Sequence, residues 1–102
     1  MGKDLYVCSL LDVYGCFLGD KQRRLTEYYY NDDLSLAEIA ENEEMTRQGV
    51  RDAIKRAVKQ LNELEEKCNY CSKFYRLKQL SQAARSGVLS DYSEMLDIID
   101  NI

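Results

Sequence analysis

The residues best suited to chemistry are concentrated in one short segment, residues 46–59. Its cations are spaced one to four positions apart, and they are Arg47, Arg51, Lys55, Arg56 and Lys59. With the single acid Asp52, the segment carries a net charge of +4, whereas the whole chain carries −4. Guanidinium and ammonium groups bind phosphates, and arginine also pairs with the two acceptors of guanine. The segment therefore predicts a surface that recognises nucleic acid.

A recognition helix divides its residues between two tasks. Those near its N-terminus reach base edges in the major groove, which assigns base contact to Arg47, Gln48 and Arg51. The residues expected to contact phosphates are the cations farther along and the first residue of the segment, and they are Thr46, Lys55, Arg56 and Lys59. The alternative is a solvated helix face, on which Asp52 and Arg56 form an ion pair across one turn.

The rest of the chain offers little for catalysis. It has no histidine and no glycine-rich phosphate loop. Cys68 and Cys71 have CxxC spacing, but the seven residues between Cys8 and Cys16 do not complete a zinc knuckle. We therefore expect ordinary thiols, with a metal site or redox pair as the alternative. No cofactor, metal, small-molecule substrate or enzymatic activity is expected.

The elements that position the basic segment are expected to be helices, because the chain has no proline and only five glycines. Apolar residues recur at helical spacing from Leu5 to Cys16 or Phe17, and a second helix follows to Tyr30 with Asp20 as its N-cap. A third helix spans residues 36–42, and Ser35 and Glu38 form the capping box at its start. A fourth begins at Thr46, which caps it.

The fourth helix is expected to be long, since its apolar stripe continues to Tyr75. About 25 residues would span nearly 38 Å, so the second half of the stripe must pack on the C-terminal segment or on another subunit. A further helix is expected from Tyr75 to Ala84, and a last one over residues 91–100, capped by Ser90. We expect a helix-turn-helix core over residues 1–68 and a C-terminal helical extension of the same domain over residues 69–102, with dimerisation as its possible task.

Two helices joined by a tight turn, the second of them cationic, predict a helix-turn-helix. Ala37 and Ala40 allow the two helices to approach closely. The apolar residues expected to fill the space between them are Leu36, Ile39, Met45, Val50 and Ile54. Any helical hairpin also places alanine at such a crossing, so the chemistry of the second helix carries the prediction.

Four segments in this order resemble the YlxM family. They are LLDVYG (10–15), KQR (21–23), YYNDDLSLAEIAE (29–41) and RQGVRDAIKRA (47–57). The resemblance covers about residues 5–68. It implies a fold like the promoter-binding helix-turn-helix domain of sigma factors. Because the family's genes lie beside those of signal recognition particle components, it also implies a regulatory role in that pathway.

The chain departs from the family in the turn between the two motif helices. Relatives carry an apolar residue and a glycine where this sequence has Glu43 and Glu44. A left-handed glutamate is strained by roughly 1 kcal/mol, so Asn42 is expected to take that conformation instead. Both glutamates are expected to oppose phosphates approaching Arg47.

Two functions are therefore carried forward. The first is a homodimeric DNA-binding regulator that binds weakly, because the pI is about 4.8. The second is an adaptor that uses the same scaffold to contact a protein or ribonucleoprotein, such as a signal recognition particle component. No window approaches the roughly 18 apolar residues of a membrane span, and the first residues lack the pattern of a signal peptide. A cytoplasmic protein is expected.

Overall fold

The computed structural model describes residues 4–89 and 91–102, and the secondary structure in these ranges is entirely helical. The chain divides into two compact units, Met1–Lys67 and Cys68–Ile102. Among the residues described, no helix combines the length and the apolarity needed to cross a bilayer. The expected all-α fold is confirmed.

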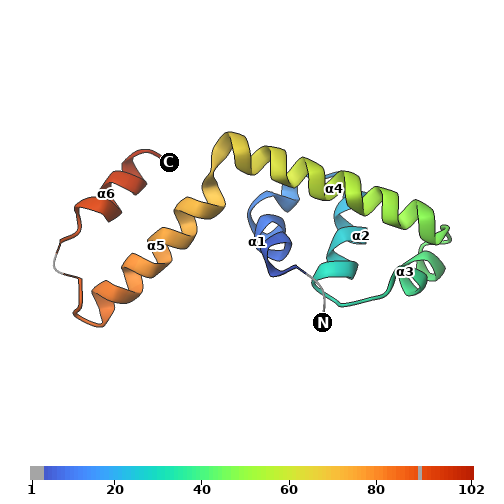
Figure 1. Cartoon of the computed structure of the whole chain (residues 1–102), viewed down its shortest axis with the longest axis horizontal. Coiled ribbons are helices and arrows are strands. Elements are labelled where there is room, and N and C mark those ends of the chain that lie inside the picture. The colour runs from blue at the N-terminus through green and yellow to red at the C-terminus, as the bar shows by residue number, and fades with distance from the viewer. Residues whose placement is uncertain (1–3, 90) are drawn as a thin grey trace. The chain divides into compact units, whose positions relative to one another are not determined.

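The described part of the first unit, from Asp4 on, contains four α-helices and a short 3₁₀ helix. Their bounds are α1 Leu5–Tyr14, η1 Gly15–Phe17, α2 Asp20–Tyr30, α3 Leu36–Asn42 and α4 Arg47–Cys68. In Figure 1, α1 and α2 lie on the same side of α4, and α3 lies near the N-terminal end of α4. The long helix α4 is thus the element on which the other three are arranged.

The core that joins the helix-turn-helix to α2 has the composition that the sequence predicted. Its buried members are Leu25, Ile39, Ala40, Val50 and Ile54. Leu36 and Met45 are partly buried against them. The small side chain of Ala40, which is 6% exposed, allows the close approach of neighbouring helices. Apolar burial on one face of α4 therefore leaves its opposite face in water.

A buried polar contact connects α1 to the far half of α4. The hydroxyl of Tyr14 donates a hydrogen bond of 2.6 Å to the carboxylate of Glu65. Tyr14 is 1% exposed and Glu65 is 8% exposed. A buried carboxylate needs hydrogen-bond donors to replace water, so this contact fixes the first helix to the last one of the unit.

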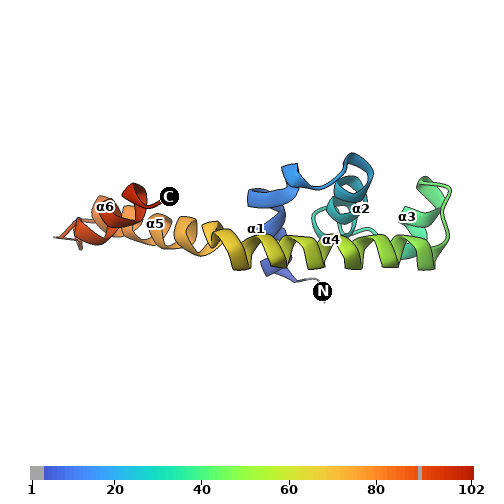
Figure 2. The same ribbon diagram turned by 90° about the horizontal axis from the view of Figure 1, so that it is seen from above.

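The second unit is a pair of helices, α5 Tyr70–Arg85 and α6 Ser93–Asp100. They lie side by side in both views (Figure 1, Figure 2). The guanidinium of Arg76 donates two hydrogen bonds to the Glu94 carboxylate, at 2.7 and 2.9 Å. Among the described residues of this unit, Leu80 is the one buried apolar residue, and α6 has none.

The structure corrects the expected helix bounds after Lys67. The expected helix of about 25 residues is shorter, and the apolar stripe to Tyr75 does not lie on one helix, because α4 ends at Cys68 after 22 residues and Asn69 adopts the left-handed conformation with φ of 59°. The next helix then starts at Tyr70. The last helix starts at Ser93, where the Asp91 carboxylate accepts hydrogen bonds from the backbone amide and hydroxyl of Ser93. The expected cap at Ser90 lies outside the described residues.

One bound near the N-terminus also differs. Gly19, rather than Asp20, is the N-cap of α2, and Asp20 is the first helical residue. In the first turn, the Asp20 carboxylate still interacts favourably with the helix dipole.

Candidate nucleic-acid interface

The helix-turn-helix is built by a capping box and a tight C-terminal turn on α3. The hydroxyl of Ser35 accepts a hydrogen bond from the Glu38 amide, and the Glu38 carboxylate accepts one from the Ser35 amide, both at 3.1 Å. At the other end, the amide of Met45 donates to the Ala40 carbonyl at 2.9 Å. The amide of Glu44 donates to the Glu41 carbonyl at 3.4 Å. These two bonds are the Schellman arrangement, which reverses the chain directly after a helix.

Glu44 occupies the left-handed position of this turn, with φ of 54°. The expectation that Asn42 would take it is wrong, because α3 continues through Asn42 and the Schellman arrangement needs the left-handed residue two positions later. Glycine is usual there, since a β-carbon is crowded by the backbone. The turn therefore stores backbone strain beside the basic helix.

The start of α4 is fixed by Thr46, as the sequence predicted. Its hydroxyl accepts a hydrogen bond of 2.9 Å from the amide of Gly49. A β-carbon at Gly49 would lie 3.0 Å from that hydroxyl, which explains why a residue without a side chain suits this position. Met45 before the cap and Val50 after it both pack on the core, as in a hydrophobic staple. The direction of α4 is thus set by local contacts.

The seven residues predicted to contact nucleic acid are all exposed. They are Thr46, Arg47, Gln48, Arg51, Lys55, Arg56 and Lys59. Arg47, Arg51, Lys55 and Lys59 follow one another at intervals of four, so they form a row along the helix. None of the five cations forms a salt bridge with any residue in the described part of the chain. Their charges are therefore available to an anionic ligand.

Asp52 is a hydrogen-bond acceptor on this face that was not among the residues predicted to contact nucleic acid. The side-chain amide of Gln48 donates a hydrogen bond of 3.0 Å to the carboxylate of Asp52. The ion pair suggested for Asp52 and Arg56 is absent from the described contacts, and Asp52 faces Gln48 one turn earlier instead. A carboxylate at a base edge accepts a hydrogen bond from cytosine. The contact between Gln48 and Asp52 could have been predicted from their spacing of four residues on a helix.

The two acids of the turn behave differently. The guanidinium of Arg24 donates to both carboxylate oxygens of Glu43, at 2.7 and 3.2 Å. The Arg24 hydrogen bond holds the pKa of Glu43 below its ordinary value of 4.5, and the charge of Lys21 adds to the effect. Only Glu44 is thus left as an exposed acid that faces solvent at the start of α4, without a salt-bridge partner among the described residues.

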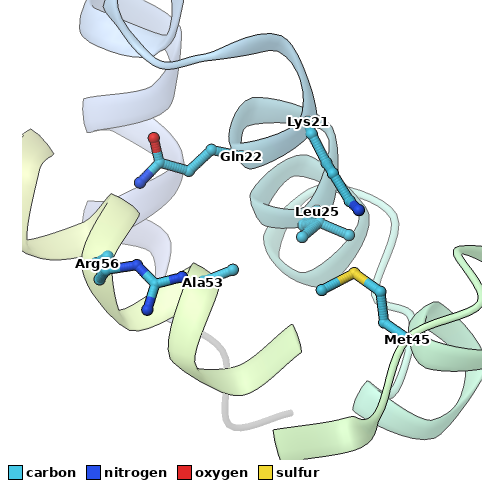
Figure 3. A pocket seen from close by; sticks show the side chains of 6 residues that line it. All are labelled: Lys21, Gln22, Leu25, Met45, Ala53 and Arg56. Carbon is cyan, nitrogen blue, oxygen red and sulfur yellow. The ribbon is translucent and has the colours of Figure 1, made fainter. Parts of the chain in front are cut away.

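Arg56 falls outside the four-residue spacing of the row, although it shares one hollow with Lys59. It borders a hollow of about 450 Å³, together with Lys21, Gln22, Leu25, Met45 and Ala53. Figure 3 shows Lys21, Gln22 and Leu25 on α2, Ala53 and Arg56 on α4, and Met45 extending toward Leu25 from the turn before α4. Arg51 and Lys55 border a different hollow of about 320 Å³, whose wall includes Tyr29 and Tyr30. The structure therefore places Arg56 and its sequence neighbour Lys55 at different hollows.

Comparison with known proteins supports the helix-turn-helix assignment. Residues 1–101 match the model of a family described as "UPF0122: Putative helix-turn-helix protein, YlxM / p13 like". The chain belongs to this family. A UPF0122 protein of Geobacillus sp. (strain WCH70) is 42% identical over 100 residues, which cover 98% of this chain and 91% of that protein.

Two further relatives have similar identities. A UPF0122 protein of Shouchella clausii (strain KSM-K16) is 40% identical over 91 residues, covering 89% of this chain and 84% of the relative. A UPF0122 protein of Clostridium perfringens (strain ATCC 13124) is 45% identical over 76 residues, covering 72% of this chain and 68% of the relative. The predicted family membership is thus confirmed, and the family model extends beyond the residues that carried the resemblance.

Proposed function

We propose that the chain is a DNA-binding regulator that inserts the N-terminal half of α4 into the major groove. The single observation that carries this proposal is a row of exposed cations on the second helix of a helix-turn-helix, which form no salt bridge with the described residues. Arg47, Gln48 and Arg51 would read base edges, with Asp52 as an additional acceptor. The phosphate contacts would come from Thr46, Lys55, Arg56 and Lys59.

The acidity of the rest of the chain does not cancel this attraction. Charges separated by more than about 8 Å are largely screened at physiological ionic strength, so remote acids contribute little at the interface. Glu43 is also engaged with Arg24, at 2.7 Å. If four or five phosphates are neutralised, a plot of the logarithm of the association constant against the logarithm of salt concentration should have a slope of about −4.

A salt titration of duplex binding by fluorescence anisotropy tests the proposal. The Arg47→Ala, Arg51→Ala, Lys55→Ala triple variant should lose most of the affinity and reduce the magnitude of the slope by about three. A matched triple variant, Lys67→Ala, Lys78→Ala, Arg85→Ala, removes the same charge from exposed positions off the row. It should keep the slope. A flat slope for the unmodified protein, or equal losses in the two triples, would refute the proposal.

We further propose that the regulator acts in the signal recognition particle pathway, on the family resemblance alone. The second candidate is an adaptor for a protein or ribonucleoprotein of that pathway. Its support is the net charge of −4 and the exposed apolar residues of the second unit, among them Leu96 at 55% and Ile99 at 52%. Sequencing and mass spectrometry of the material bound to the tagged protein in cells would separate the two, since the basic triple variant should lose DNA and retain an adaptor's partner.

A homodimer is part of the regulator proposal, because two recognition helices on a two-fold axis address half-sites about 34 Å apart. Tyr75 on α5 is 67% exposed, and together with Leu96 and Ile99 it supplies apolar surface for self-association. Residues 69–102 are accordingly proposed as the dimerisation segment. Sedimentation should give twice the chain mass of 11.9 kDa at micromolar concentration. The mass of a single chain would contradict dimerisation without affecting DNA contact by one copy.

A further inference from the structure

The hollow beside Arg56 has an apolar floor and a cationic rim. Leu25, at 1% exposed, belongs to the core, and Met45 and Ala53 are partly buried against that core. Lys21 and Arg56 extend from different helices at the rim (Figure 3). Its volume of about 450 Å³ is within the range of pockets that hold ligands. The hollow is therefore large enough to receive a side chain of another molecule.

Among the described residues that line this hollow there is no acid, although the chain contains more acids than bases. The acids of α2, Asp20 and Glu27, border a separate hollow with Arg23 and Arg24. Glu43 is held by Arg24. Neither Lys21 nor Arg56 forms a salt bridge within the described residues. The rim therefore carries a net positive charge, which favours an anionic ligand with an apolar part.

We propose that the hollow binds an acidic segment of a partner protein. One apolar side chain of that segment covers Met45 and Ala53, and a carboxylate lies beside Lys21 or Arg56. An amphipathic helix in a groove supplies both groups at successive turns. A phosphodiester backbone would meet the cations but leave the apolar floor in water, so a peptide matches the lining better than nucleic acid does. This site goes beyond the proposed function, because it does not require the chain to bind DNA.

Methyl NMR of the full chain tests the site directly. The probe is a synthetic helical peptide with one phenylalanine flanked by glutamates on the same face, and the observed groups are the methionine methyls. Met45 lines the hollow, whereas Met95 on α6 serves as the internal control. The Met45 resonance should shift and saturate while that of Met95 stays in place. A peptide with alanine for the phenylalanine should not produce this shift.

Charge-reversal variants supply the second measurement. Lys21→Glu should weaken peptide binding about fivefold to tenfold, which is the scale of exposed ion pairs that are reversed as well as lost. Lys67→Glu makes the same change at an exposed position of α4 outside the hollow and should have little effect. Arg56 stays unchanged, because it is also in the proposed phosphate set. Ala53→Met, which fills the hollow without changing charge, should weaken binding as well.

Three results would overturn the site: equal losses in Lys21→Glu and Lys67→Glu, equal binding of the alanine peptide, or a Met45 methyl that responds to duplex DNA and not to peptide. The salt slope of DNA binding is measured separately and should be the same in Lys21→Glu as in the unmodified protein. Failure of DNA binding would therefore leave the peptide result interpretable.

Discussion

Glu44 is the position where one substitution should make the protein both more stable and better suited to anions. Its φ of 54° places a β-carbon in the left-handed region, which costs about 1–2 kcal/mol for a residue other than glycine. Glycine loses more backbone entropy on folding, roughly 0.5–1 kcal/mol. The exposed carboxylate has no salt-bridge partner among the described residues, so its removal subtracts little. Glu44→Gly should therefore raise the free energy of unfolding by about 0.5–1 kcal/mol.

Urea denaturation followed by circular dichroism measures this gain, and thermal unfolding should show a rise of about 2–8 °C for a domain of this size. Glu44→Ala is the matched control, since it removes the carboxylate but keeps the β-carbon. It should stay within about 0.5 kcal/mol of the unmodified protein. Equal stabilities of the glycine and alanine variants would refute the assignment of strain to the backbone.

The same variants separate strain from charge in DNA binding. Glu44→Gly and Glu44→Gln both remove a negative charge close to the start of α4, so both should raise duplex affinity at low salt. Only the glycine variant should gain stability. If affinity rises with glycine and not with glutamine, the effect comes from the backbone of the turn rather than from the carboxylate.

Three further predictions concern the contacts that hold the first unit together. Tyr14→Phe removes the hydroxyl that donates to the buried carboxylate of Glu65 at 2.6 Å. It should lower the free energy of unfolding, measured by urea titration, by about 1–3 kcal/mol. An unchanged urea midpoint would exclude a structural role for that hydrogen bond. Thr46→Ala loses the cap on Gly49 and should cost about 0.5–2 kcal/mol, while Thr46→Ser should retain most of the stability. Because Arg24 lowers the pKa of Glu43, their pair stabilises the fold fully above the ordinary Glu43 value of 4.5, and this contribution disappears as pH falls through the lowered value. The stability difference between the unmodified protein and Arg24→Gln should accordingly be constant near neutral pH and vanish in acid, and a difference that persists below the lowered pKa would contradict the carboxylate's part in it.

The features that could be predicted from the sequence are those decided within one or two turns of chain. The bounds of α3, the capping box at Ser35 and the cap at Thr46 depend on hydrogen bonds that span three residues. The apolar face of α4 repeats every three or four residues, and its solvent-facing cations follow from the same period. Local chemistry was sufficient for the motif, whereas the family was predicted from the resemblance of four sequence segments.

Other features were missed because several local solutions compete. Asn69 interrupts a stripe that continues in sequence to Tyr75, and periodicity alone does not register one left-handed residue. Asp52 had two partners at helical spacing, Gln48 and Arg56, and the structure places Gln48 beside it. The choice between such alternatives depends on side-chain rotamers, which cannot be read from the sequence.

The sequence by itself determined that the chain is helical, that it contains a helix-turn-helix and that α4 presents a cationic face. Only the tertiary structure decided which charges remain available on that face. The pairing of Arg24 with Glu43 joins residues 19 positions apart, and that of Tyr14 with Glu65 joins residues 51 apart. The hollow between Lys21 and Arg56 likewise depends on how α2 packs against α4. Such contacts are set by the packing of apolar faces, which brings distant side chains together without any local sequence signal.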